Sequence, residues 1–97
     1  MLRDLDEGRA SIGYFVVPSA RGRRAAARGL AAMARWADND LHIPRIQVYI
    51  EPWNIGSIRT AEAAGFTKEG LLRGWQIVDD ERRDMLMYSL LASELED

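Results

Sequence analysis

The chain contains no cysteine and a single histidine. Without cysteine it forms no disulfide, offers no thiolate ligand to a metal and supplies no thiol nucleophile. One histidine is too few for a histidine metal cluster. The lack of cysteine favours a reducing, cytoplasmic setting.

Long apolar runs are also missing. Residues 1–7 contain no apolar core of signal-peptide length, and no stretch approaches the roughly 20 apolar residues that span a membrane. The net charge of -2 gives no general attraction to nucleic acid or anionic lipid, although five arginines lie between positions 21 and 35. We therefore expect no membrane or nucleic-acid partner, and any anion site has to be local.

The composition is that of a small folded domain. Apolar residues make up 47% and charged residues 29% of the 97 positions, which is typical of globular proteins and too apolar for a disordered chain. This length allows one small core, and the sequence contains no repeat and no Pro/Gly/Ser linker. We predict a single domain over residues 1–97.

Hydrophobic periodicity predicts the order β-α-β-α-β-β, an α/β (α+β) fold with a mixed sheet and two helices. The first strand, residues 10–17, has β-branched and aromatic residues on both faces and should be buried on both sides. The remaining elements are predicted as a helix over residues 22–39, a strand over 45–51, a helix over 55–64, a strand over 66–72 extended to 78, a polar turn over 79–81 and a strand over 83–91.

Spacing also predicts which side chains face inward. Spacings of three and four in the first helix mark Ala26, Leu30, Met33, Ala37 and Leu41. The second helix should pack Ile55, Ile58 and Ala61 inward and end at Gly65. In the strand between them, Ile46, Val48 and Ile50 share one face, and Gln47, Tyr49 and Glu51 share the other.

The turn at residues 18–26 joins a buried strand directly to the start of a helix. The first amides of a helix lack intrahelical partners and, with the positive end of the helix dipole, suit a phosphate or diphosphate. Arg21, Arg23 and Arg24 add positive charge there. The turn has neither the Walker A pattern nor three spaced glycines, so an anion site and a solvated, arginine-rich helix start both remain open.

Four motifs follow one another along nearly the whole chain. They are Ile12-Gly13-Tyr14-Phe15-Val16-Val17-Pro18, Ala20-Arg21-Gly22-Arg23-Arg24-Ala25-Ala26, Asn54-Ile55-Gly56-Ser57-Ile58-Arg59 with Ala64-Gly65-Phe66, and Tyr88-Ser89-Leu90. In order and spacing they resemble the C-terminal part of the RimJ/RimL branch of the GNAT superfamily of N-acetyltransferases. The resemblance implies a partial GNAT fold that transfers an acetyl group from acetyl-CoA to a primary amine, either a protein N-terminus or a small amine.

The resemblance also implies where acetyl-CoA lies. The first two strands are expected to splay apart, with the pantetheine arm between them on the backbone of Tyr14, Phe15, Val16 and Val17. The diphosphate is expected on the turn formed by Arg21, Gly22, Arg23, Arg24, Ala25 and Ala26. The family has a glycine where this chain has Arg24, so that side chain either crowds the diphosphate or neutralises it.

Two interpretations are open for Asn54 and Ser57. An asparagine before a helix, with a hydrogen-bonding residue three positions later, is ordinary capping chemistry. The resemblance implies in addition that Asn54 hydrogen-bonds the pantetheine or a bound water, and that Ser57 donates to the departing thiolate of CoA. Many GNAT enzymes carry a tyrosine acid at the position of Ala61, so that proton source is absent here.

Glu51 is the candidate proton acceptor, directly or through water, because it ends a strand beside the expected acyl site. The alternative is a solvated strand-end carboxylate. Some RimL-like relatives have a glutamate in the region of Gln76, which cannot act as a base. An α-amino group, with a pKa of about 7.7–8.0, loses its proton more easily than lysine, at about 10.4, so an N-terminal acceptor needs little help. Direct attack in a ternary complex is the expected route.

The resemblance further implies that the N-terminal strands and helices of the domain, which build much of the acceptor groove, are missing. The first strand is then left with an uncovered edge, and we expect a homodimer or other self-association to cover it. The alternative function is a non-catalytic acyl-CoA-binding or interaction module derived from a truncated GNAT domain.

Overall fold

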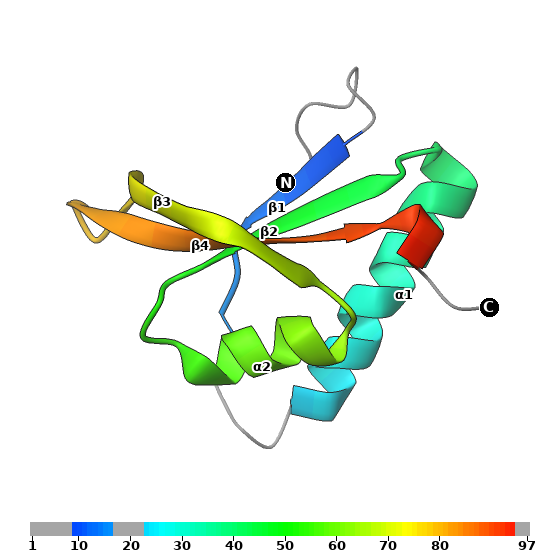
Figure 1. The fold of residues 1–97 in the computed structure, drawn as a ribbon, viewed down its shortest axis with the longest axis horizontal. Helices are drawn as coiled ribbons and strands as arrows, with labels where there is room; N and C mark the ends of the chain where they lie inside the picture. Colours follow the sequence, from blue (N-terminus) through cyan, green and yellow to red (C-terminus); the bar gives the residue numbers. More distant parts are fainter. Residues whose placement is uncertain (1–8, 17–22, 95–97) are drawn as a thin grey trace.

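The computed structural model describes residues 9–16 and 23–94 (Figure 1). Its elements are β1 (Arg9–Tyr14), α1 (Arg23–Leu41), β2 (Arg45–Ile50), α2 (Ile55–Ala63), β3 (Thr67–Val78), β4 (Glu81–Leu91) and a 3₁₀ turn, η3 (Ala92–Glu94). The predicted order β-α-β-α-β-β is confirmed. Within the described ranges, no helix has the length and apolar character needed to cross a membrane.

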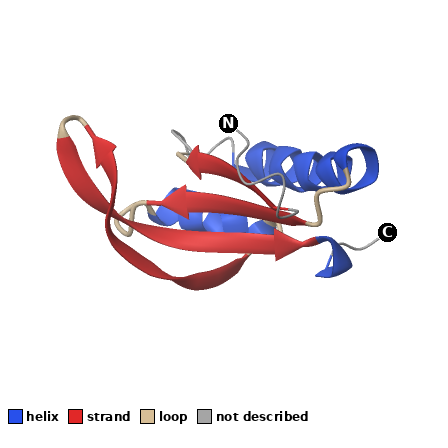
Figure 2. Ribbon diagram, turned by 90° about the horizontal axis from the view of Figure 1, so that it is seen from above, coloured by secondary structure: helices blue, strands red, loops and turns tan. Residues whose placement is uncertain are grey.

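One mixed sheet organises the fold, with its four strands in the order β1-β2-β4-β3. β1 and β2 are parallel, and the other two pairings are antiparallel. The two helices pack against each other on one face of this sheet (Figures 1 and 2). The arrangement confirms the predicted α/β class.

The face covered by the helices holds the apolar core. β2 and β4 contribute Ile46, Val48, Ile50, Leu86, Tyr88 and Leu90 to it. α1 buries Ala27, Leu30, Ala34 and Ala37. The predicted inward face of α1 was therefore partly wrong: Ala26 and Met33 are half-buried and Leu41 is exposed. The small alanines allow the helix to approach the core closely, which places the longer Met33 at its margin.

α2 presents a small and partly polar face to the sheet. Its buried residues are Ser57, Thr60 and Ala61, whereas Ile55, which was predicted to pack inward, is 52% exposed. Spacing alone favoured the larger residue, but short side chains let this helix lie close to the sheet. Gly65 follows the helix with φ of 97°, a conformation that glycine adopts without strain, as predicted for the helix end.

The opposite face of β2 is also buried, although its side chains are polar. Gln47, Tyr49 and Glu51 are only 7%, 7% and 3% exposed. Gln47 Nε2 donates to Ser11 Oγ at 3.2 Å and to the Tyr49 hydroxyl at 3.0 Å. The Tyr49 ring also meets Trp75 of β3, with ring centroids 5.6 Å apart. These partners satisfy the polar groups of Gln47 and Tyr49, which explains how the two side chains remain buried.

β3 and β4 form a hairpin that extends beyond the shorter strands and curls at its far end (Figure 2). β3 is one continuous strand whose register shifts near Gly74, where φ is 56°. Asp79 and Asp80 both have positive φ, 52° and 65°, as in a two-residue hairpin turn. The turn is shorter than predicted, because β4 already begins at Glu81.

Candidate functional site

The two parallel strands end at the same edge of the sheet. β1 ends at Tyr14 and β2 at Ile50, and strands that run in the same direction have their carboxyl ends side by side. α1 and α2, which follow these strands, begin at Arg23 and Ile55. Both helix starts lie beyond this edge (Figure 1). In open α/β sheets, ligands bind at edges of this kind.

β1 and β2 stay paired almost up to this edge. Tyr14 is in register with Tyr49, after an irregularity that begins at Ser11. The Phe15 N–H donates to the Tyr49 carbonyl at 2.8 Å, so this amide is engaged by β2. The expected separation of the strands can begin only beyond Phe15, at Val16, which is 41% exposed. The predicted positions Val17, Arg21 and Gly22 lie outside the described residues, as do the side chains of Tyr14 and Arg23.

The start of α1 carries its charges against the usual order. Arg24 and Ala25 are exposed there. The first turn of the helix contains no acidic residue and the last turn no basic residue, while Asp38 and Asp40 lie close to its C-terminal end. The helix dipole favours the reverse arrangement. This order therefore destabilises the helix unless an anion binds at its N-terminus.

The turn from β2 into α2 brings Glu51, Asn54 and Ser57 together. The Asn54 N–H donates to the Glu51 carbonyl at 3.0 Å, and Asn54 Oδ1 accepts from the Ser57 N–H at 3.1 Å. All three residues are buried, with exposures of 3%, 8% and 0%. The capping role predicted for Asn54 is confirmed. Through these two hydrogen bonds, Asn54 holds the backbone of Glu51 and Ser57 in one turn.

Glu51 has an ion-pair partner that the sequence did not reveal. Arg83 Nη1 of β4 lies 3.0 Å from Glu51 Oε1, and Arg83 Nη2 lies 3.5 Å from Glu81 Oε2. The Glu51 side chain is 4% exposed and that of Glu81 is 72% exposed, so the two carboxylates differ sharply in environment. The expectation of a solvated strand-end carboxylate at Glu51 is wrong, because the hairpin brings a guanidinium over it.

Tyr88 and Ala61 belong to the core. Tyr88 is 2% exposed and Ala61 is fully buried, both within one apolar cluster. Burial raises the pKa of the Tyr88 phenol, and the charge of Glu62 and a hydrogen bond to it raise this pKa further. The phenol is therefore neutral near pH 7.

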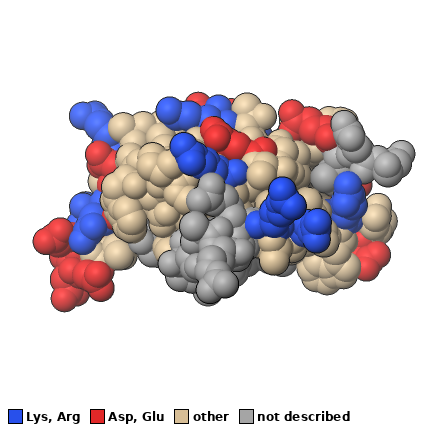
Figure 3. All heavy atoms as spheres, turned by 90° about the horizontal axis from the view of Figure 1, so that it is seen from below, with Lys and Arg blue, Asp and Glu red and all other residues tan. Residues whose placement is uncertain are grey.

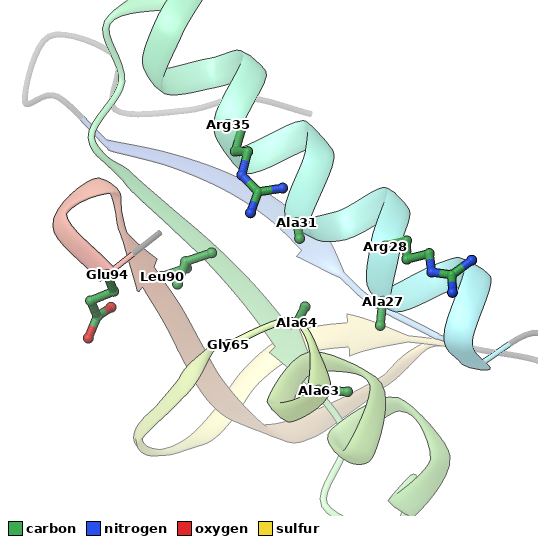
Figure 4. Close-up of a pocket in the computed structure, with 9 residues that line it drawn as sticks. All are labelled: Ala27, Arg28, Ala31, Arg35, Ala63, Ala64, Gly65, Leu90 and Glu94. Carbon is green, nitrogen blue, oxygen red and sulfur yellow. The ribbon is translucent and has the colours of Figure 1, made fainter. Parts of the chain in front are cut away.

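Two surface hollows adjoin α1, and neither is lined by Glu51, Asn54 or Ser57. One, of about 340 Å³, lies between α1 and the end of α2; its lining includes Arg35 on one side and Glu94 on the other (Figure 4). The other, of about 310 Å³, is lined by Phe15, Ala26, Gly29, Leu30 and Met33. This apolar hollow joins the end of β1 to the first turns of α1.

Charged side chains are unevenly spread over the helix side of the molecule. Figure 3 shows Lys and Arg in several separate groups. Acidic side chains gather at the end of the hairpin, where Asp79, Asp80 and Glu81 are exposed. Among the residues that the structure describes, no group of three or more His, Cys, Asp or Glu side chains could hold a metal ion.

Comparison with known proteins gives consistent results. Residues 1–67 match the model of the acetyltransferase (GNAT) domain family. The chain is 33% identical over 91 residues to an uncharacterized N-acetyltransferase, p20, of Bacillus licheniformis, a match that covers 94% of this chain and 51% of p20.

Two solved structures also resemble this chain. RimJ of Mycobacterium smegmatis, in complex with CoA-disulfide, is 30% identical with a TM-score of 0.71, covering 93% of this chain and 43% of RimJ. The microcin C7 self-immunity acetyltransferase MccE, in complex with acetyl-CoA and AMP, is 25% identical with a TM-score of 0.75, covering 91% of this chain and 49% of MccE. The chain thus spans about half the length of these relatives.

Proposed function

The chain belongs to the GNAT acetyltransferase family, with RimJ-like relatives, and from this premise we propose that it binds acetyl-CoA and transfers the acetyl group to a primary amine. The amine is a protein N-terminus or a small amine. The observation that carries the proposal is that the carboxyl ends of β1 and β2 lie side by side and that both strands lead into helix N-termini. Such an arrangement offers amides without intrahelical partners at the start of α1 and the turn with Asn54 and Ser57 at the start of α2.

The diphosphate of acetyl-CoA is proposed to rest on the first turn of α1. The exposure of Arg24 and Ala25 and the charge order of the helix support this position. A bound anion there is stabilised by both the helix dipole and the arginine charge. In this proposal Arg24 neutralises the diphosphate. The pantetheine arm runs along the chain beyond Phe15, since the Phe15 amide is already bonded to β2.

In the proposed reaction the amine nitrogen attacks the thioester carbonyl carbon within a ternary complex. A C–N bond forms, the C–S bond breaks, and CoA leaves as a thiolate. Starting from an ammonium group, one proton goes to solvent and a second ends on the CoA sulfur. One proton is therefore released for each acetyl group transferred.

Three buried residues near the end of β2 are assigned roles in this reaction. Ser57 donates its hydroxyl hydrogen bond to the developing thiolate. Asn54 caps α2 through Oδ1, and its amide nitrogen is a separate donor that suits a carbonyl oxygen of pantetheine. Glu51 receives a proton from the amine, directly or through water. All three residues belong to one hydrogen-bonded turn, which supports their assignment to a single site.

Self-association is also proposed, because β1 pairs with only one neighbour among the described strands. An open strand edge is a ready template for pairing with another chain. A second copy that covers this edge gives a homodimer. Sedimentation at micromolar concentration tests this point, and a compact monomer would remove its basis.

Two measurements on the same chain test the main proposal. Calorimetric titration with acetyl-CoA should show saturable binding, weakened by added salt because the diphosphate is held by charge. Release of free CoA thiol should then depend on an added amine, with N-terminal peptides and small amines as the panel. Absence of acetyl-CoA binding overturns the proposal. Binding without turnover across a broad panel favours the alternative, a non-catalytic acyl-CoA-binding module.

A further inference from the structure

We propose that Arg83 is a positioning residue of the acetyl-transfer site, which holds the Glu51 carboxylate ionised and fixed in place to receive the proton of the acceptor amine. This inference rests on the function proposed above. Arg83 lies on β4, 32 residues from Glu51 in sequence, and neither the motifs nor the resemblance single it out.

Burial makes the Glu51 carboxylate dependent on a counter-charge. Its side chain is 4% exposed, and an ionised carboxylate is unstable in such a place unless it is paired and hydrogen-bonded. Arg83 Nη1 donates to Glu51 Oε1 at 3.0 Å, a charge-assisted hydrogen bond. Arg83 therefore favours the ionised form, which is the form able to accept a proton.

The orientation of Arg83 favours Glu51 at the expense of its own hydrogen bonding. Its Nε is buried and has no hydrogen-bond partner, an arrangement that is rare in folded proteins and destabilising. Its other contact, with Glu81, is exposed and contributes little. A local arrangement that lowers stability in this way is typical of functional positions.

The described elements around Glu51 bring both charged and uncharged groups near it. The turn into α2 brings Asn54 and Ser57, which are uncharged. β3 places uncharged Gln76 in register with Arg83. β4 contributes Arg83, which also forms an ion pair with Glu81. Removal of the Arg83 charge should thus raise the pH at which Glu51 titrates.

The proton transfer is balanced without any further reactant. One N–H bond of the acceptor ammonium breaks and its proton moves to a Glu51 carboxylate oxygen, which leaves the neutral amine as nucleophile. The proton then passes to solvent and Glu51 returns to its ionised form beside Arg83.

The test compares Arg83→Gln with Arg83→Lys, which keeps the charge, and with Arg82→Gln as matched control. Arg82 is the neighbouring residue on β4 and contacts the Gly74 carbonyl instead. The titration of Glu51 is followed in the intact chain by side-chain ¹³C NMR. In Arg83→Gln it should move up by about one pH unit or more, while Arg83→Lys and Arg82→Gln should stay close to the wild-type value.

The rate of CoA thiol release against pH gives the second readout. Its acid limb should move upward in Arg83→Gln by the same amount, with the dissociation constant for acetyl-CoA changed less than twofold. A purely structural ion pair would still raise the pH at which Glu51 titrates in Arg83→Gln and lower the melting temperature, but it would leave the acid limb of the rate profile unmoved, and that result overturns the inference. If Arg83→Gln does not fold, Arg83→Lys is compared with the wild type alone. An upward shift of both its acid limb and its Glu51 titration would then overturn the inference, because lysine keeps the positive charge.

The two proposals fail in distinguishable ways. If the wild-type chain does not bind acetyl-CoA, the proposed function fails while the NMR titration still reports on the pair. If it binds and turns over but Arg83→Gln leaves the Glu51 titration unmoved, the positioning role alone is wrong.

Discussion

Reversing the charge of Arg24 should separate ligand binding from stability. Arg24 is exposed in the first turn of α1, next to amides that lack intrahelical partners. Arg24→Glu removes a positive charge from the proposed diphosphate site and places a negative one there. The same change puts an acid at the positive end of the helix dipole, where it is favourable. Binding should weaken while the ligand-free chain becomes more stable.

The expected size follows from the exposure of this site. Two unit charges about 8 Å apart in a water-like dielectric interact by about 0.5 kcal/mol. Arg24→Glu changes the charge at this position by two units, and the diphosphate carries about two charges. The binding free energy should therefore fall by about 2 kcal/mol, which raises the dissociation constant roughly 30-fold at low salt. Screening at 0.15 M salt reduces this to about 0.8 kcal/mol, roughly fourfold. The ligand-free helix should gain about 1 kcal/mol from its dipole.

Isothermal titration with acetyl-CoA at low and at physiological salt measures the first effect, and urea unfolding measures the second. Arg28→Glu is the control, because it makes the same charge change one turn further along the exposed side of α1. Equal losses for both variants, or wild-type affinity for Arg24→Glu at low salt, would refute the assignment of the diphosphate to the helix start. Tighter binding by Arg24→Gly would show that the arginine crowds the ligand.

Substitutions at three further positions test other parts of the molecule. Asn54→Ala should cost about 1 kcal/mol in the free energy of unfolding by urea, with Asn54→Asp close to wild type, because the cap to the Ser57 N–H is lost only in the first; equal stability of all three would contradict the cap. Ser57→Ala should lower the rate of CoA thiol release by about tenfold or more with little change in acetyl-CoA affinity, and an unchanged rate would remove Ser57 from the chemistry. The raised pKa of Tyr88 means that folding stability is fully present below pH ~10 and falls as the pH rises towards the folded-state pKa. Tyr88→Phe should abolish this alkaline decline in an unfolding series above pH 9, and a decline that persists would point to another group.

Sequence periodicity predicted the elements and their order but was less reliable for the side chains that face inward. Alternation in β2 correctly placed Ile46, Val48 and Ile50 together in the core. In α2 it favoured Ile55, yet the structure buries Ser57 and Thr60 instead. Apolar spacing reports how favourable it is to bury a side chain, and it does not report how close a helix must come to its sheet. Close approach selects small residues even when they are polar.

The candidate site was predictable where it depends on neighbours in sequence. Glu51, Asn54 and Ser57 lie within one turn, so strand-end and capping patterns found them. Arg83 could not be found in this way, because its contact with Glu51 depends on how the hairpin is registered against β2. That register pairs Ile50 of β2 with Leu86 of β4, and the turn that leads into β4 is one residue shorter than the predicted turn over residues 79–81. A long-range contact of this kind has no local signal.

The different sheet positions of β1 and β2 have a consequence for stiffness. β2 has a strand on each side and side chains buried on both faces, whereas β1 has a described neighbour on one side only. Amide hydrogen exchange should therefore be slowest in β2 and faster in β1, because local opening is easier where fewer contacts must break. In the proposed reaction, Glu51 follows the strand that is expected to open least, and the proposed diphosphate site follows a strand that is expected to open more readily. The ligand site could then adapt to its ligand while the position of Glu51 stays fixed.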